Sequence, residues 1–150
     1  MGSRRKGRIL AFQALYSWDV HHDRSREASI PEGLLDFSWT TQPSDGETSA
    51  FSRLLVTGTI ENISAVDKMI GRHLDNWELK RLNRVDLAIL RMSVYTLMYQ
   101  KDMPPSVVID EAIDISKEFG AEDSYRFVNG VLDGIRKTIE LNGNPSGKPQ

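Results

Sequence analysis

The chain has 150 residues and a formal net charge of −2, and this length suits one compact domain or two small lobes around a shared core. It contains no cysteine, which excludes disulfides and thiolate metal sites and favours a cytoplasmic protein. No apolar run approaches the roughly 20 residues of a membrane span, and the N-terminus lacks the uncharged apolar stretch of a secretory signal, so we expect no membrane protein.

The positive charge of the chain is concentrated at its N-terminus. Residues 1–8 carry four basic side chains and no acidic one, so the formal charge is +4 there and −6 across the remaining residues. These basic residues, which we call the basic head, are Arg4, Arg5, Lys6 and Arg8. The simplest interpretation is a solvated arm, and the alternative is a contact site for an anionic partner.

Residues from about 4 to 22 form the first predicted helix. Its apolar positions spread around most of the helical wheel, which is typical of a helix enclosed by others. They are Ile9, Leu10, Phe12, Ala14, Leu15, Trp18 and Val20. Arg8, Phe12 and Tyr16 recur at intervals of four, and Arg5 lies within about 20° of Tyr16 on the wheel. Tyr16 is therefore predicted to cap a basic ridge, unless its ring belongs to the core and only its hydroxyl meets water.

Residues 23–46 are predicted to be a connection with at most one short helix near residues 32–37. Proline and glycine punctuate this stretch, at Pro31, Gly33, Pro43 and Gly46. One long helix is then predicted over about 47–74, with an apolar stripe at helical spacing. The stripe consists of Val56, Ile60, Ile63, Ile70 and Leu74. Gly58 within this helix indicates a close helix contact, because an interior glycine otherwise costs about 1 kcal/mol relative to alanine.

The segment that follows Asn83 is predicted to be the central helix of an all-α fold. Asn83 can cap its N-terminus, and Asp86 three residues later approximates a capping box. Two apolar stripes follow, which indicates burial on two faces. They are Val85, Ala88, Met92 and Tyr95, and Leu87, Leu90, Val94 and Leu97.

Two prolines then interrupt the chain and begin another helix. Pro104 and Pro105 cannot continue a helix but can start one, and Gly120 is predicted to end it as a left-handed stop. Val108, Ala112 and Ile115 are expected to face inward. The acidic residues Asp110, Glu111 and Asp114 indicate a solvated face or a surface for a basic protein partner.

The last predicted helix runs from about residue 123 to residue 140, and residues 142–150 are expected to be a disordered tail. Its buried stripe is predicted to be Tyr125, Val128, Val131, Leu132, Ile135 and Ile139. Phe127 lies about 110° from the centre of this stripe, close to Arg126 and Asn129. We expect its ring to be partly exposed; the alternative is that it packs under a neighbouring helix.

Guanidinium groups beside exposed aromatic rings suit single-stranded nucleic acid, because the cations contact phosphates while the rings stack on unpaired bases. Enzymatic interpretations lack support. The chain has no phosphate-cradling glycine motif, no nucleophile elbow and no cysteine nucleophile. His21, His22 and Asp23 lie together in sequence but point in different directions and lack further ligands. We therefore expect no catalytic residue, no metal site and no cofactor.

Three segments resemble the NusB family of bacterial transcription antitermination factors. They read "RRKGRILAFQALYSWDV", "NRVDLAILRMSVYTLMY" and "VVIDEAIDISKEFGAEDSYRFVNGVLDGI". The resemblance covers roughly residues 4–20 and 80–137 and implies a compact bundle of about six to seven helices in two lobes, within one domain over residues 1–141. It also implies no catalysis, and binding of a short single-stranded RNA element, boxA, together with the small-subunit ribosomal protein NusE. That assembly joins the RNA polymerase elongation complex with other Nus factors and supports transcription of ribosomal RNA.

The resemblance implies a set of RNA-binding residues. Position by position they are Arg4, Arg5, Lys6, Arg8, Gln13, Tyr16, Asp86, Arg126, Phe127 and Asn129. Gly7 departs from the basic run and should loosen the start of the helix. Asp86 and Asp123 would place carboxylates beside RNA, either as acceptors for base edges or as repulsion that limits affinity.

Two other functions stay open at this point. The first is a protein-only adaptor that holds a basic partner with its acidic helices, without any role for the basic head. The second is an accessory domain of an enzyme, since similar helical domains precede RNA methyltransferases. No cofactor domain follows in this sequence, which disfavours the second.

Overall fold

The computed structural model describes residues 3–21, 30–31, 33–37, 46–75 and 78–142. These residues form six α-helices and two short 3-10 helices, and no strand occurs among them. The helices are α1 (Ser3–His21), η2 (Leu34–Asp36), α2 (Gly46–Glu61), α3 (Ile63–Gly71), η4 (Leu79–Arg81), α4 (Arg84–Tyr99), α5 (Pro105–Phe119) and α6 (Ser124–Asn142). The all-α prediction and the first helix are confirmed, and η2 lies where a short helix was predicted within the connection, of which residues 22–29, 32 and 38–45 are outside the described residues.

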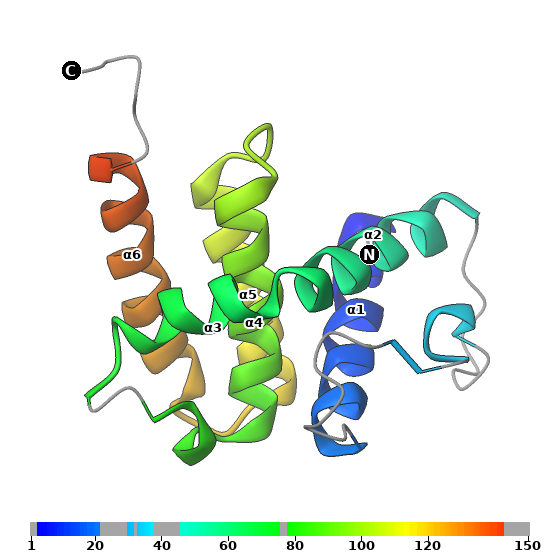
Figure 1. Cartoon of the computed structure of the whole chain (residues 1–150), viewed down its shortest axis with the longest axis horizontal. Helices are drawn as coiled ribbons and strands as arrows, with labels where there is room; N and C mark the ends of the chain where they lie inside the picture. The colour runs from blue at the N-terminus through cyan, green and yellow to red at the C-terminus, as the bar shows by residue number, and fades with distance from the viewer. Residues whose placement is uncertain (1–2, 22–29, 32, 38–45, 76–77, 143–150) are drawn as a thin grey trace.

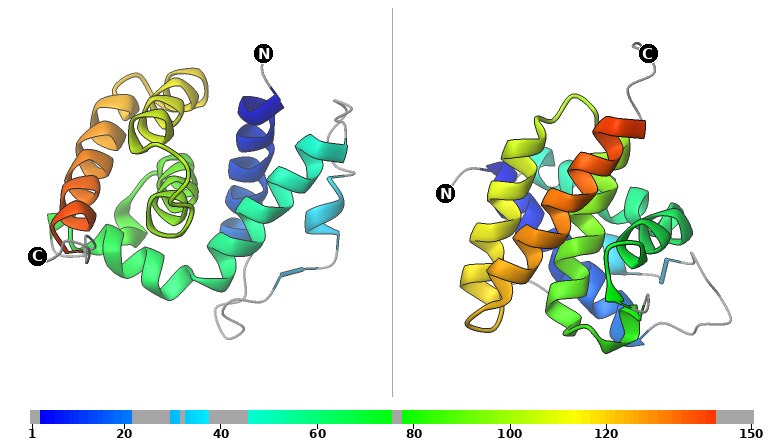
Figure 2. Two further views of the ribbon diagram at one scale, coloured as in Figure 1. Left: turned by 90° about the horizontal axis from the view of Figure 1, so that it is seen from above. Right: turned by 90° about the vertical axis from the view of Figure 1, so that its left-hand side faces the viewer.

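The helices are arranged in two lobes, as predicted. Figure 1 shows α1, η2 and α2 on one side and α6 on the other, with α4 in the middle of the view in front of α5. Figure 2, seen from above, shows α2 and α3 crossing one face of the molecule from the first lobe to the second. Helix α4 packs against α1, α2, α3, α5 and α6 and therefore belongs to both lobes.

Helix α4 is the buried centre of the fold. Asn83 caps it, because its side-chain oxygen accepts hydrogen bonds from the backbone N–H groups of Val85 (2.8 Å) and Asp86 (3.3 Å). Every residue from Asp86 to Leu97 is buried. The two predicted apolar stripes therefore face packed neighbours on both sides.

The close contact predicted at Gly58 is present. The ring of Tyr95 on α4 lies directly over this glycine of α2, so that a Cβ atom at position 58 would overlap the ring. The absence of a side chain at Gly58 therefore sets the spacing between α2 and α4.

The prediction of one continuous helix over 47–74 is wrong, because the chain turns at Asn62 between α2 and α3. The Asn62 side chain donates a hydrogen bond to the carbonyl oxygen of Gly58 (2.8 Å). Its backbone adopts φ −113° and ψ 24°, outside the helical well. A side-chain amide that competes for helix carbonyls favours such a break. Ile60 and Ile63 are buried on either side of it.

The predicted left-handed stop at Gly120 is also wrong. Gly120 ends α5 with φ −91° and ψ −179°, an extended conformation open to any residue. A Cβ atom there would lie 2.8 Å from the carbonyl oxygen of Ser116 and 2.9 Å from the Cβ atom of Ser124. The glycine therefore permits the close turn from α5 into α6.

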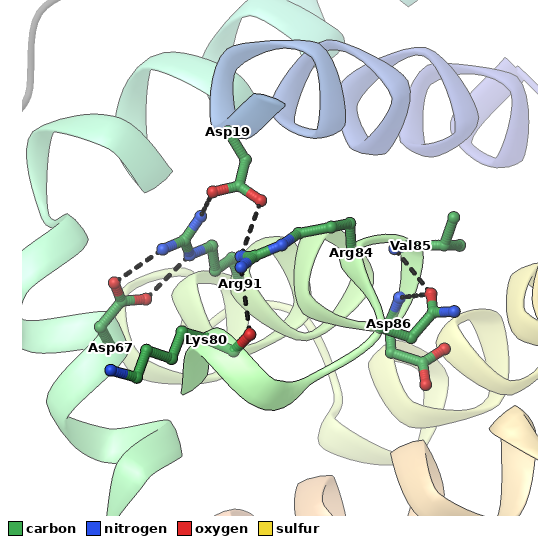
Figure 3. A network of polar contacts seen from close by, with 8 residues as sticks. Asp19, Asp67, Lys80, Arg84, Val85, Asp86 and Arg91 are labelled. Carbon is green, nitrogen blue, oxygen red and sulfur yellow. Dashed lines mark hydrogen bonds and ion pairs between the residues drawn. The ribbon is translucent and has the colours of Figure 1, made fainter. Parts of the chain in front are cut away.

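A buried arginine joins the two lobes (Figure 3). Arg91 of α4 donates two hydrogen bonds of 2.9 Å to Asp67 of α3 and lies 3.3 Å from a carboxylate oxygen of Asp19 of α1. Arg84 reaches the other oxygen of Asp19 at 3.2 Å. Because both carboxylates meet the rigid fork of one guanidinium, this network fixes α1 and α3 relative to α4.

Helix α6 packs on α4 and α5 through four fully or nearly buried residues, Val128, Val131, Leu132 and Ile135. It ends at Asn142, which was predicted to begin the tail, and residues 143–150 lie outside the described residues. The single domain over 1–141 stays a prediction. Among the helices of the described residues, none combines the length and the apolar character needed to cross a bilayer.

Candidate nucleic-acid interface

The basic head forms the first turns of α1. The helix begins at Ser3 and continues through Gly7, which was expected to loosen it. Gly7 is buried against α2: a Cβ atom there would lie 2.7 Å from the Phe51 ring, and the Ser52 hydroxyl donates a hydrogen bond to the Gly7 carbonyl oxygen (2.8 Å). The glycine therefore lets α1 approach α2 closely.

Two arginines of the basic head bind carboxylates of α5. Arg5 donates from Nε and Nη2 to the two oxygens of Glu111 (3.0 and 2.9 Å) and from Nη2 to Asp114 (2.6 Å). Arg8, whose side chain is only 7% exposed, lies 3.6 Å from Glu111. The hydrogen bond from Arg5 is the main cause that lowers the pKa of Glu111, against the effect of burial. The same bond raises the pKa of Arg5, whereas burial lowers the pKa of Arg8.

The other two cations of the basic head differ in their surroundings. Arg4 is exposed, with its guanidinium 4.4 Å from the centroid of the Phe51 ring, a cation–π distance. Lys6 is partly buried. The basic head is thus a helical surface with extensive contacts to α2 and α5.

The predicted ridge along α1 is exposed at one end only. Arg8 and Phe12 are 6% and 3% exposed, and the Phe12 ring packs against Phe119 of α5 with centroids 5.2 Å apart. They face α5 because they lie one turn apart on the same side of α1. Tyr16, one turn further, is 39% exposed, and Gln13 beside it is partly buried.

The first turns of α6 present the other predicted residues. Arg126, Phe127 and Asn129 are exposed, and the Phe127 side chain is 37% accessible. The wheel argument placed Phe127 outside the buried stripe, and Val128 beside it is fully buried. Solvent therefore reaches this ring, and its role in binding stays a prediction.

Asp86 is less accessible than an RNA contact would suggest. It is 7% exposed, and its carboxylate accepts a hydrogen bond from the Ser124 hydroxyl at the start of α6. Burial raises the pKa of Asp86, and the bond from Ser124 opposes that shift. Ser124 in turn accepts a hydrogen bond from the backbone N–H of Ala121 (3.1 Å). Asp86 therefore connects the start of α4 with the turn between α5 and α6.

The structure adds residues that the sequence analysis did not select. Phe119, at the end of α5, is 36% exposed, and its ring contacts the ring of Phe12. Tyr125 was placed in the buried stripe, but its ring is only partly buried and carries Lys117 and Arg126 at 5.0 and 5.4 Å from its centroid. The signal available for Phe119 was its position just before Gly120, at a helix end where an apolar ring is incompletely covered.

These exposed rings gather at one end of the molecule. In Figure 1, α1 and α5 end and α4 and α6 begin at the lower end of the view. Phe119 at the end of α5 packs on Phe12 in the middle of α1, and Asp86 near the start of α4 lies beside Ser124 at the start of α6. We call Tyr16, Phe119 and Phe127 the aromatic end. The basic head lies at the opposite end of α1.

These features define the class: an all-α protein of two lobes, with partly exposed rings on α1, α5 and α6 and a basic head at the start of α1. The model of the NusB family matches residues 5–137. The transcription antitermination protein NusB of Treponema denticola is 55% identical over 135 residues, which cover 89% of this chain and 95% of that protein.

Solved structures agree with this assignment. NusB of T. maritima superimposes with a TM-score of 0.75 at 38% identity, over 89% of this chain and 90% of that one. A complex of the antitermination factors NusB and NusE with dsRNA contains a chain that matches with a TM-score of 0.74 at 27% identity, over 92% of this chain and 98% of that one. The chain therefore belongs to the NusB family, whose members named here are transcription antitermination proteins.

Proposed function

We propose that this chain is a non-catalytic, cytoplasmic antitermination factor that binds boxA-like single-stranded RNA together with the ribosomal protein NusE. In this role it joins the RNA polymerase elongation complex with other Nus factors and supports transcription of ribosomal RNA. Membership of the NusB family and the similarity to a NusB chain solved with NusE and RNA support the proposal.

The observation that carries the RNA part of the proposal is the aromatic end. Tyr16, Phe119 and Phe127 are each more than a third exposed, although large rings usually gain by burial. Each ring that stacks on a base contributes about 1–3 kcal/mol. Arg126 and Lys117 supply positive charge over the partly buried ring of Tyr125, two residues before Phe127, and cations beside exposed rings suit unpaired bases joined by phosphates.

The basic head is proposed to add affinity for phosphate, through fewer contacts than its four cations would allow. Four phosphate contacts on a single strand would give a log–log salt slope of about −3. Arg5 and Arg8 are engaged by Glu111, and if only two of the four cations meet phosphate the slope falls to about −1.4. A measured slope between these values would show how many of the four cations meet phosphate.

The NusB and NusE complex was solved with dsRNA. The ability of bases to stack on protein rings distinguishes single-stranded from double-stranded RNA. Bases inside a duplex are already stacked on one another and are not available to protein rings. If Tyr16 and Phe127 stack on bases, this chain binds a single strand more tightly than the duplex of the same sequence.

A filter-binding experiment tests the proposal. A boxA-like single strand, its scrambled version and its duplex are each titrated with and without NusE. We expect the boxA-like strand to bind most tightly, and NusE to strengthen that binding. Equal binding of all three RNAs would contradict the proposal.

Binding of RNA only through NusE would favour the protein-only adaptor. The structure weakens that alternative, because two carboxylates of α5, Glu111 and Asp114, already bind Arg5. Asp110, which is exposed on the same helix, is the carboxylate of this group for a basic partner to contact.

A further inference from the structure

The groove between α1 and α5 holds cations on one wall and carboxylates on the other. It has a volume of about 610 Å³ and is lined by Arg4, Arg5 and Arg8 from α1, Glu111 and Glu118 from α5, and the apolar Met103 and Val107. The cations of the basic head therefore face carboxylates of the same chain.

The geometry of this contact is that of an arginine holding an anion. Arg5 uses Nε and Nη2 against the two oxygens of Glu111, and Nη2 also donates to Asp114. Arginine binds a phosphate through the same planar fork of N–H groups. A phosphate and the Glu111 carboxylate therefore compete for the same donors.

The contact is accessible enough to exchange. The side chains of Arg5 and Asp114 are 36% and 47% exposed, and that of Glu111 is 19% exposed. Exposed ion pairs contribute little net stability because water screens them. A polyanion that is held elsewhere on the protein can therefore displace them, whereas one without such support must compete unaided.

The aromatic end supplies that support. Arg5 and Tyr16 are 11 residues apart on α1, about 16 Å along the helix axis, a span that a few nucleotides cover. A strand whose bases stack at Tyr16 thus brings its phosphates to Arg5 at high local concentration.

We propose that Glu111 and Asp114 are specificity-determining residues, which occupy Arg5 and so weaken the binding of RNA that does not also engage the aromatic end. This inference rests on the proposed function for the identity of the preferred RNA. The competition itself concerns any phosphodiester chain.

The test compares the wild type with the variant Glu111→Gln/Asp114→Asn, using a uridine homopolymer as the non-specific strand and the boxA-like RNA as the specific one. We expect the variant to bind the homopolymer about three- to tenfold more tightly, with a salt slope steeper by about 0.7 for Arg5 and about 1.4 if Arg8 is also released. The gain for the boxA-like RNA should be smaller, so the ratio of the two affinities falls.

A matched control removes the effect of net charge. Arg136 of α6 is also held by two carboxylates, Asp133 (2.7 Å) and Glu140 (3.1 Å). The variant Asp133→Asn/Glu140→Gln changes the charge by the same amount on α6, at carboxylates that bind Arg136 and Lys137. It should leave the affinity for the homopolymer within about twofold of the wild type, because these two carboxylates pair with cations of α6 and exposed charges are screened by salt.

A second variant shows whether Arg5 is the group released. Adding Arg5→Gln to the Glu111→Gln/Asp114→Asn variant should remove the gain in homopolymer binding. Each variant is first checked for helical content by circular dichroism, and Asp114→Asn alone, at the more exposed carboxylate, serves if the double variant does not fold.

Two results would overturn the inference: unchanged or weaker homopolymer binding by Glu111→Gln/Asp114→Asn with intact helices, or an equal gain in the Asp133→Asn/Glu140→Gln control. Failure of the proposed function looks different. In that case the wild type does not prefer the boxA-like RNA over its scrambled version, whatever the homopolymer shows.

Discussion

The two ends of α1 use similar residue types in opposite ways. At the basic head, cations contact carboxylates of α5 and the ring of Phe51. At the aromatic end, Tyr16 and Phe127 are 39% and 37% exposed. The basic head, which is the more conspicuous of the two in the sequence, is thus the one whose side chains contact more groups within the protein. A cluster of charge in a sequence shows which groups exist, but only the packing shows which of them a partner can reach.

The largest expected effect is at the aromatic end. The variant Tyr16→Ala/Phe127→Ala should weaken RNA binding by about 2–6 kcal/mol, since two stacking contacts of about 1–3 kcal/mol each are lost. Melting temperature should change less than on truncation of a core residue, because more than a third of each residue is exposed. The measurement is an RNA titration beside a thermal melt.

Val20→Ala is the control for that variant, because it removes an apolar side chain of α1 that is 51% exposed. A fall in melting temperature comparable with that of a core truncation would show that the two rings are structural. Unchanged RNA affinity would remove stacking from the mechanism.

A substitution in the basic head should lower the stability of the fold. Arg8→Met removes a buried guanidinium that lies 3.6 Å from Glu111 and 5.5 Å from the Phe51 ring centroid. We expect a loss of about 1–3 kcal/mol, or about 2–4 °C in melting temperature per kcal/mol. Glu111 keeps Arg5 as a partner, which limits the loss. An Arg8→Met protein as stable as the wild type would show that this arginine is not structurally engaged.

The same end should be sensitive to acid. The hydrogen bond from Arg5 lowers the pKa of Glu111 below its ordinary value of 4.5. An acid with a lowered folded-state pKa stabilises the fold above its unfolded-state pKa, and this contribution disappears as the pH falls through the lowered value. The difference in melting temperature between the wild type and Glu111→Gln should therefore shrink below about pH 4.5. A difference that is constant from pH 7 to pH 3 would contradict this pairing.

The smallest expected effect is at Arg4. Arg4→Ala removes one exposed cation–π contact with Phe51, so stability should fall by at most about 1 kcal/mol. The salt slope of RNA binding should flatten by about 0.7 if Arg4 meets a phosphate. An unchanged slope would exclude Arg4 from the interface.

Much of the fold follows from local pattern. The burial of α4 followed from apolar residues on two faces. The angle of Phe127 to the stripe of α6 left burial and exposure both open, and the family resemblance favoured exposure. The break at Asn62 was missed because Ile60 and Ile63 continue the helical spacing across it, while the competing bond to Gly58 comes from a side chain. The conformation of Gly120 was predicted wrongly because glycine has two uses at a helix end. It allows a left-handed backbone, but it also allows a close approach, here by Ser124.

The candidate site was less predictable, because its decisive contacts join distant parts of the chain. Arg5 and Glu111 are 106 residues apart, and no pattern near Arg5 indicates a carboxylate partner. Gly7 looked like a weak point in a basic arm, whereas its missing side chain accommodates Phe51 and Ser52. Periodicity predicts which face of a helix is buried; it does not predict which charged groups of two helices meet.

Ultraviolet crosslinking of a boxA-like RNA, with the crosslinked residues identified by mass spectrometry, tests the central claim most directly. An aromatic ring at each end of α1 can report contact: Tyr16 of α1 at the aromatic end, and Phe51 of α2 beside the basic head. We predict crosslinks at Tyr16 and Phe127. Crosslinks at Phe51, with none at the aromatic end, would contradict the account.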